Sequence, residues 1–274
     1  MKFHNFTRIL CLLPCAAMLL GAAGCARSAS MEPDRSTPAY RKYLTDNFAA
    51  GRLSDGLLNS VNPGVLALLS ECMYFEDTLQ KGIAAGQTWV YSNSNAYVPQ
   101  KGYFDTMAAG ALHGANCAMA QGWALIDMGI VKSGIHLYGD KNCEIAKYDI
   151  LKPVIDEVAD IVPLQGVTFA SLYEKGEVEP GDIFFACGHT FLYLGDEKFM
   201  ATGYDAKYHT DPDAKTEDSR KGVFESFVVD MKSNTDYQYK VYWRMRFKDS
   251  YIPHFYRNAA GELTVCPLWQ EENA

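Results

Sequence analysis

The sequence predicts an α+β fold in which N-terminal helices pack on a central antiparallel sheet. Two observations support this prediction. Up to about residue 160, apolar residues recur at the three- and four-residue steps that place them on one face of a helix. Beyond that point they form short β-type runs separated by Gly, Pro or charged turns. Helices followed by a series of short strands are typical of α+β domains.

The first helical region is expected from Ala39 to about Gly86. Its clearest helix should begin at Asn62-Pro63, because Asn is a favoured N-cap and Pro is favoured in the first turn. The apolar residues that follow at helical spacing are Val65, Leu68, Leu69, Cys72, Met73 and Phe75.

Three further segments complete the helical part. A loop is expected at 89–103, a short helix at 104–114 and a longer helix at 117–128, which stops at a glycine. Residues 144–160 should form another helix, ended by Pro163. The predicted sheet strands are 167–172, 182–186, 190–194, 198–202, 222–229 and 237–247.

The N-terminus has the features of an export signal. Two basic residues precede an apolar run at 9–20. The length of this run is within the ~7–15 residues typical of the apolar region of a signal peptide and short of the ~20 needed to span a bilayer. Small residues at 21–24 then lead to Cys25 and resemble a bacterial lipobox, although Ala22 stands where leucine is more usual. We therefore expect an exported protein, anchored through a lipid on Cys25 at the cell surface or envelope. The alternative is an ordinary secretory signal and a secreted protein.

Charge and cysteine content narrow the function further. A formal net charge of −8 argues against general nucleic-acid binding, which needs a basic surface. No C-x-x-C spacing is present, so a structural zinc site is not expected. No cofactor is expected either. Of the eight cysteines, two lie in the signal and Cys25 would be lipidated, which leaves Cys72, Cys117, Cys143, Cys187 and Cys266. Because this number is odd, at least one thiol stays unpaired in a monomer.

Cys117 and His189 form the candidate catalytic pair. Cys117 opens an apolar helix-like run, and unpaired N–H groups at a helix start stabilise a thiolate. His189 opens a strand-like run, where an imidazole could take the thiol proton and return it to a leaving amine. This pair indicates a cysteine peptidase or amidase.

Three segments of the chain carry a family resemblance. Asn116-Cys117 stands where one family has Asp-Cys at a helix start. The Pro-Gly-Asp-Ile-Phe-Phe segment 180–185 is similar to that family's Pro-Gly-Asp-Leu-x-Phe strand entry, and His189 begins a strand that ends in Tyr-Leu-Gly at 193–195. Over roughly residues 100–205, the chain therefore resembles the NlpC-type cell-wall peptidases, compact papain-like enzymes of bacterial peptidoglycan. The resemblance implies a papain-like fold, Cys117 as nucleophile and His189 as base.

The third catalytic residue departs from the family pattern. The family usually has a polar residue, often histidine, on the strand after the His hairpin, and here that place falls near Ala201. Asp205 is our candidate for orienting the imidazole. The alternatives are a water, a backbone carbonyl, or one of the side chains Asn116, Thr202 and His209.

The oxyanion site also departs from the family pattern. The family places a tyrosine upstream of the cysteine, and Tyr103 is the nearest here, at a longer spacing. We interpret Tyr103 as a packing or cleft-lining aromatic. The backbone N–H of Cys117 is the expected oxyanion donor.

The leading hypothesis is an exported cysteine peptidase or amidase that hydrolyses amide bonds in peptidoglycan stem peptides. One alternative is a non-catalytic module on the same fold that binds cell wall or a partner, with the oligomeric state open. Another is a cysteine hydrolase or acyltransferase that acts on a different amide or ester. The expected layout is a signal peptide at 1–25, a tether at 26–38, a helical region at 39–95, the NlpC-like domain at 96–250 and an extension at 251–274.

Overall fold

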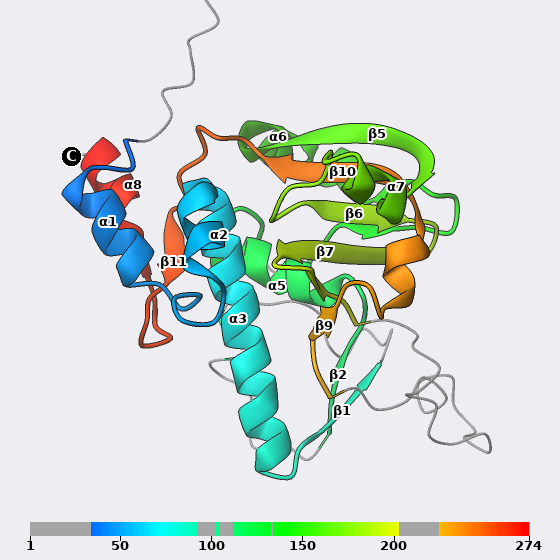
Figure 1. Ribbon diagram of the computed structural model, residues 1–274, viewed down its shortest axis with the longest axis horizontal. Coiled ribbons are helices and arrows are strands. Elements are labelled where there is room, and N and C mark those ends of the chain that lie inside the picture. The colour runs from blue at the N-terminus through cyan, green and yellow to red at the C-terminus, as the bar shows by residue number, and fades with distance from the viewer. Residues whose placement is uncertain are drawn as a thin grey trace, which may run out of the picture. The chain divides into compact units, whose positions relative to one another are not determined.

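A six-stranded antiparallel sheet forms the centre of the computed structural model, which describes residues 34–91, 102, 104, 112–132, 134–202 and 225–273 (Figure 1). Every hydrogen-bonded pair in this sheet is antiparallel. The spatial order is β5 (Ala159–Thr168), β10 (Lys240–Phe247), β6 (Ile183–Ala186), β7 (His189–Gly195), β8 (Lys198–Met200) and β9 (Val228–Asp230). The α+β class and its antiparallel sheet are confirmed.

Helices precede, interrupt and follow the sheet along the chain. They are α1 (Pro38–Thr45), α2 (Asp55–Ser60), α3 (Pro63–Ala84), α5 (Met119–Asp127), α6 (Tyr148–Val158), α7 (Phe169–Glu174), the 3-10 helix η3 (Thr235–Gln238) and α8 (Pro267–Glu272). Three two-stranded sheets complete the described elements: β1 (Thr88–Tyr91) with β2 (Leu112–Ala115), β3 (Tyr138–Gly139) with β4 (Ile145–Ala146), and β11 (Phe255–Arg257) with β12 (Leu263–Val265).

Both faces of the central strands are buried, each in its own apolar cluster. Successive side chains of a strand point to opposite faces. On β7, Leu192 and Leu194 therefore enter the larger cluster with residues of α3 and α5, while Phe191 and Tyr193 enter a smaller one with Phe169 of α7. This double burial explains why β6 and β7 are almost uninterrupted apolar runs.

The long helix α3 begins where the sequence predicts. The side chain of Asn62 accepts a hydrogen bond from Val65 N at 2.8 Å, and Pro63 occupies the first helical position. The helix packs against α5, and its side chains from Val65 to Phe75 are almost all buried. Capping and periodicity agree here, and the prediction is confirmed.

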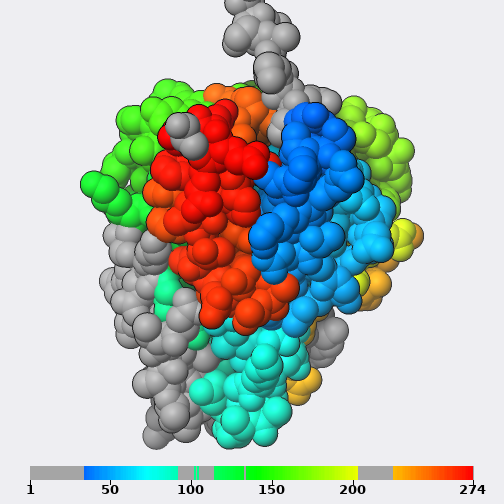
Figure 2. All heavy atoms as spheres, turned by 90° about the vertical axis from the view of Figure 1, so that its left-hand side faces the viewer, coloured from blue at the N-terminus to red at the C-terminus, as the bar shows by residue number. Residues whose placement is uncertain are grey.

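The two ends of the described chain lie side by side. Figure 2 shows the first helices and the C-terminal residues adjacent on one face, and α1 contacts α8 while α3 contacts β11. Beneath them, the fully buried Arg257 donates to Glu71 Oε2 and to Asp127 Oδ2, each at 3.1 Å. The N-terminal helices, the sheet and the C-terminal residues all belong to one compact unit, Glu32–Ala274.

Several element predictions were wrong. Residues 88–91 and 112–115 form a parallel strand pair instead of a loop and a helix end, because Trp89 is fully buried and the two segments satisfy each other's backbone groups. Residues 169–174 form α7 and not a strand, since the Thr168 side chain caps the N–H of Ser171.

Pro163 marks no helix end either. Helix α6 stops at Val158, and Pro163 lies within β5, which has only β10 as a neighbour in the sheet. Proline is tolerated on such an edge strand because its missing N–H need not bond to a second neighbour.

Candidate active site

Cys117 lies in the turn that joins β2 to α5. The Asn116 side chain accepts a hydrogen bond from Ala118 N at 3.0 Å, and Met119 N donates to the Asn116 carbonyl at 3.2 Å. These bonds place Cys117 one residue before Ala118, the N-cap of α5. The cysteine is only 7% exposed.

His189 is held between Asp236 and Cys117. Its Nε2 lies 2.9 Å from Oδ1 of Asp236, and the two side chains are 10% and 3% exposed. The imidazole also interacts with the Cys117 thiol, and each of the two groups shifts the pKa of the other. Because Asp236 occupies Nε2, Nδ1 is the nitrogen left to face the sulfur. The side chains of Cys117, His189 and Asp236 are therefore arranged in series, with the imidazole between the thiol and the carboxylate.

The sheet order brings Asp236 to His189. Val241, near the start of β10, pairs with Ala186 of β6, and Ala186 pairs with His189 of β7. The residues just before β10 therefore lie at the same end of the sheet as the histidine. There the Asn234 side chain accepts from Asp236 N at 2.8 Å and starts η3, which fixes the carboxylate beside the imidazole.

Charge interactions in this site favour the ionised pair. Burial opposes ionisation of the Cys117 thiol, but the hydrogen bond and charge of His189 outweigh it and hold the pKa of the thiol below its ordinary value. Burial likewise opposes protonation of His189, but the adjacent Asp236 carboxylate and Cys117 raise the pKa of the imidazole well above its usual range. Both directions stabilise a thiolate beside an imidazolium at neutral pH.

Tyr91 and Thr190 also contact the thiol. A hydrogen bond from the Tyr91 hydroxyl and another from the backbone N–H of Thr190 help to lower the pKa of Cys117. Tyr91 reaches this position because it ends β1 opposite Ala115 of β2, two residues before the cysteine. The sequence interpretation missed Tyr91, since it assigned this segment to a loop.

A cavity of about 840 Å³ opens at the thiol. Cys117, Asn116 and Tyr91 line one side, and the segment from Gly134 to Lys141 lines much of the rest. Lys147, Ile150, Gly188, Ala118 and Met119 are the other lining residues that the structure describes. The volume is in the range that holds a small ligand or a few residues of a peptide.

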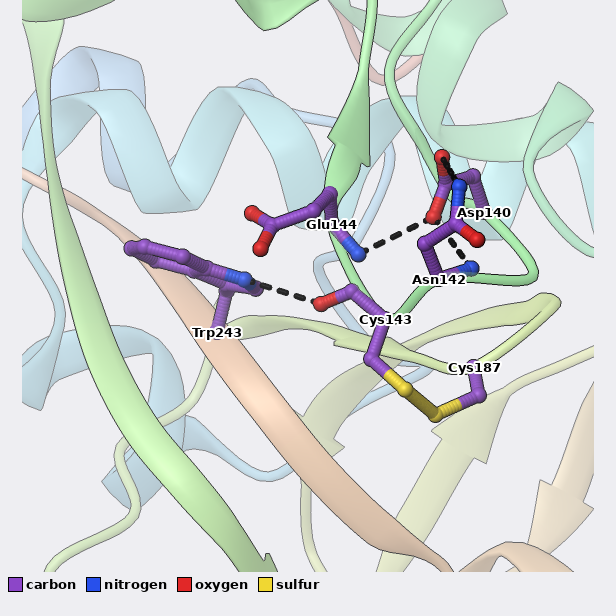
Figure 3. Close-up of a disulfide and its surroundings, with 6 residues drawn as sticks. All are labelled: Asp140, Asn142, Cys143, Glu144, Cys187 and Trp243. Atoms are coloured by element: carbon purple, nitrogen blue, oxygen red, sulfur yellow. Dashed lines mark hydrogen bonds between the residues drawn. A yellow bond between two sulfur atoms is a disulfide. The ribbon is translucent and has the colours of Figure 1, made fainter.

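A disulfide fixes this cavity wall to the histidine hairpin (Figure 3). Cys143, in the turn between β3 and β4, is bonded to Cys187, two residues before His189. Trp243 Nε1 donates to the Cys143 carbonyl at 3.0 Å, and the Asp140 side chain accepts from the N–H groups of Asn142 and Glu144. The disulfide role that the sequence left open for Cys187 is thus assigned. Cys72, Cys117 and Cys266 are buried free thiols.

Backbone contact reinforces the same junction. Gly139 N donates to Thr190 Oγ1 at 2.9 Å, and Gly188 N donates to the Asp140 carbonyl at 2.7 Å. A Cβ added at Gly139 would lie 2.1 Å from the carbonyl oxygen of Ala186, which only backbone movement could relieve. The wall and the strand that carries His189 therefore meet as one fixed element.

The structure does not test the predicted third residue. Asp205, our candidate, lies outside the described residues, as do the alternative His209, Tyr103 and the proposed lipid anchor Cys25. Asn116 serves the turn instead, and the buried Thr202 hydroxyl has no hydrogen-bond partner in the structure. The carboxylate that contacts His189 belongs to Asp236. Its only sequence signal is the capping pattern Asn234-Thr235-Asp236, which says nothing of the histidine.

Comparison with known proteins gives no relative. No family model, no curated protein and no solved structure matches the chain. Among the residues with a described position, no three His, Cys, Asp or Glu side chains gather as metal ligands. In that same part of the chain, no helix is both long and apolar enough to cross a membrane.

Proposed function

We propose that this protein is an exported cysteine peptidase or amidase that hydrolyses amide bonds in peptidoglycan stem peptides. The series Cys117–His189–Asp236, whose cysteine lines a peptide-sized cavity, carries the proposal. A structural cysteine needs neither a paired imidazole nor a depressed pKa, whereas both are means by which a nucleophilic cysteine is activated. Cys72, by contrast, is buried and its pKa is raised well above the ordinary value, chiefly by burial.

Each side chain then has a defined step. The Cys117 thiolate attacks the amide carbonyl, and the imidazolium of His189 donates its proton to the leaving amine. The thioester that results is hydrolysed by a water from which His189 removes a proton. Asp236 holds the ring and stabilises its charged form throughout.

Two donors are placed for the oxyanion. The backbone N–H of Cys117 lies in the turn that leads into α5, and the Tyr91 hydroxyl interacts with the sulfur. The oxygen of the tetrahedral intermediate is bonded to the carbon that the sulfur attacks. A donor next to the sulfur can therefore also reach that oxygen. Tyr91 thus takes the role that the family resemblance assigns to an upstream tyrosine.

The finer fold assignment and the substrate rest on other support. A cysteine at a helix start facing a histidine at a strand start of an antiparallel sheet is the papain-like arrangement, which the segments at 116–117, 180–185 and 189–195 also indicate. The signal and lipobox-like residues up to Cys25 would place the site outside the cytoplasm, beside the cell wall. The contact of Asp236 with His189 favours this proposal over a non-catalytic binding module on the same fold.

The test is cleavage of purified cell-wall fragments by the mature protein and by Cys117→Ala, with free carboxylates and amines counted as products. We expect the variant to lose all cleavage. Cys266→Ala is the matched control, because it removes another buried free thiol, and it should keep the activity. Cleavage that persists in Cys117→Ala disproves the proposal.

A further inference from the structure

The cavity beside Cys117 carries an uneven set of charges. Its described ionisable lining includes Asp140, His136 and two lysines, Lys141 and Lys147. Burial lowers the pKa of His136, so this ring is neutral at pH 7. The ammonium groups of Lys141 and Lys147 are therefore the positive charges that the described cavity lining contributes, in addition to the imidazolium of His189.

The negative charge of Asp140 is directed into its own turn. One carboxylate oxygen accepts from Asn142 N at 2.7 Å and from Glu144 N at 3.0 Å, and the other lies 3.4 Å from Asn142 Nδ2. These bonds, led by the one from Glu144, lower the pKa of Asp140, with a smaller contribution from Lys141. Neither lysine forms an ion pair within 4.0 Å in the described part of the chain, so both can accept an anionic partner.

The backbone of both lysines is held in place. Lys141 belongs to the turn closed by the bond from Asp140 N to the Glu144 carbonyl, at 2.9 Å, and by the Cys143–Cys187 disulfide. Lys147 has a left-handed backbone, with φ of 68°, at the point where β4 gives way to α6. The long side chain of an exposed lysine can adjust to a ligand while its backbone stays fixed in the cavity wall.

We propose that Lys141 and Lys147 make this wall a subsite for a carboxylate, so that the protein prefers substrates with a free carboxylate near the bond attacked by Cys117. The chain as a whole has a net charge of −8, so a cationic cavity is a local exception that would concentrate anions at the thiol. Where it concerns the substrate, this proposal rests on the proposed function. Peptides that bear free carboxylates are the class it names.

The charge of the cavity can be tested without any substrate. Iodoacetate and iodoacetamide both alkylate a thiolate by displacing iodide from carbon, and they differ only in carrying a carboxylate or a neutral amide. We expect the rate with iodoacetate divided by the rate with iodoacetamide to fall about 3-fold or more at Cys117 in Lys141→Met/Lys147→Met. The same ratio should stay near wild type in Lys141→Arg/Lys147→Arg. Added salt should reduce the ratio in the wild type more than in the Met variant.

A matched control removes two other exposed lysines. Lys81→Met/Lys175→Met changes the net charge equally but leaves the cavity lining intact, and it should keep the wild-type ratio. A Met variant with an unchanged ratio, or a control with an equal fall, overturns the proposal. Mass spectrometry of the alkylated peptides assigns the rates to Cys117.

A second assay addresses the substrate. For the wild type, KM should be about 3-fold or more lower for wall peptides with a free carboxylate than for the same peptides amidated at that position. The difference in KM should shrink in the Met variant. Equal KM values for both peptides in the wild type count against the subsite. If the wild type cleaves no peptide, the proposed function fails, while the alkylation ratio still decides whether the wall binds carboxylates.

Discussion

Removal of the negative charge at Asp236 is the perturbation that tests the site most directly. Asp236→Asn keeps an oxygen that can accept from Nε2 of His189 but loses the charge, whereas Asp236→Ala loses both. Since Nε2 lies 2.9 Å from Oδ1 and both side chains are nearly buried, solvent screens this pair little. A hydrogen bond to a charged group contributes ~1.5–3 kcal/mol.

That energy sets the expected loss of rate. Each ~1.4 kcal/mol of transition-state stabilisation is a factor of ten, so kcat/KM should fall about 10-fold in Asp236→Asn and about 100-fold in Asp236→Ala. The loss should appear in kcat, because the carboxylate contacts the catalytic base and does not line the cavity. Both variants should be compared with wild type by thermal unfolding, so that loss of activity is separated from loss of fold.

The pH profile gives the sharper readout. In the wild type, activity should rise as pH rises through the pKa of Cys117, which lies below the thiol's ordinary value of 9.0. It should fall as pH rises through the pKa of His189, which lies well above 6.5. Without the carboxylate the imidazolium is less stable, so the alkaline limb should move to lower pH. The thiolate also loses part of its partner's charge, so the acid limb should move to higher pH.

The active range should therefore narrow from both sides in Asp236→Asn. Iodoacetamide alkylation of Cys117 against pH reports the acid limb, and kcat/KM against pH reports both limbs. The reasoning is refuted if the folded variant keeps kcat/KM within 2-fold of wild type and both limbs at their original pH.

Three further changes have distinct expected outcomes. Tyr91→Phe removes one hydrogen bond to the sulfur, so alkylation of Cys117 at pH 7 should slow about 3-fold, and an unchanged rate would exclude the contact. Cys143→Ala/Cys187→Ala opens a link between residues 44 apart and should lower the free energy of unfolding by ~3–4 kcal/mol in urea melts, whereas a difference under ~1 kcal/mol would argue against the disulfide. Arg257→Met removes the cation that pairs with two buried carboxylates and should cost ~3–5 kcal/mol of stability by the same melts, whereas a loss under ~1 kcal/mol would contradict the prediction.

The parts of the fold that could be predicted from sequence are those that local rules decide. The Asn62 cap and the apolar spacing after it place α3, and the change of period marks where the sheet begins. The segment 167–172 was assigned wrongly because a short apolar run is compatible with a strand or a buried helix, and a single capping threonine decided for the helix.

Residues that act through tertiary pairing could not be found in this way. Tyr91 reaches Cys117 only because β1 pairs in parallel with β2, a contact that the sequence around Tyr91 does not indicate. The pairing of Cys143 with Cys187 likewise depends on the β3–β4 turn meeting the β6–β7 turn. No spacing rule distinguishes this pair from the other pairs that the five cysteines after Cys25 allow.

Asp236 shows most clearly why the third residue lies beyond local rules. It is 47 residues from His189, and its position depends on a β-bulge in β10. Trp243 pairs with Phe185, but Val241 pairs with Ala186, so Val241 and Tyr242 together oppose a single residue of β6. Without that extra residue, the chain before it would be displaced by one position and its side chains would point to the opposite face. The bulge thus helps to set where η3 and Asp236 lie beside His189, and it follows from how the strands fit together and not from any one of them.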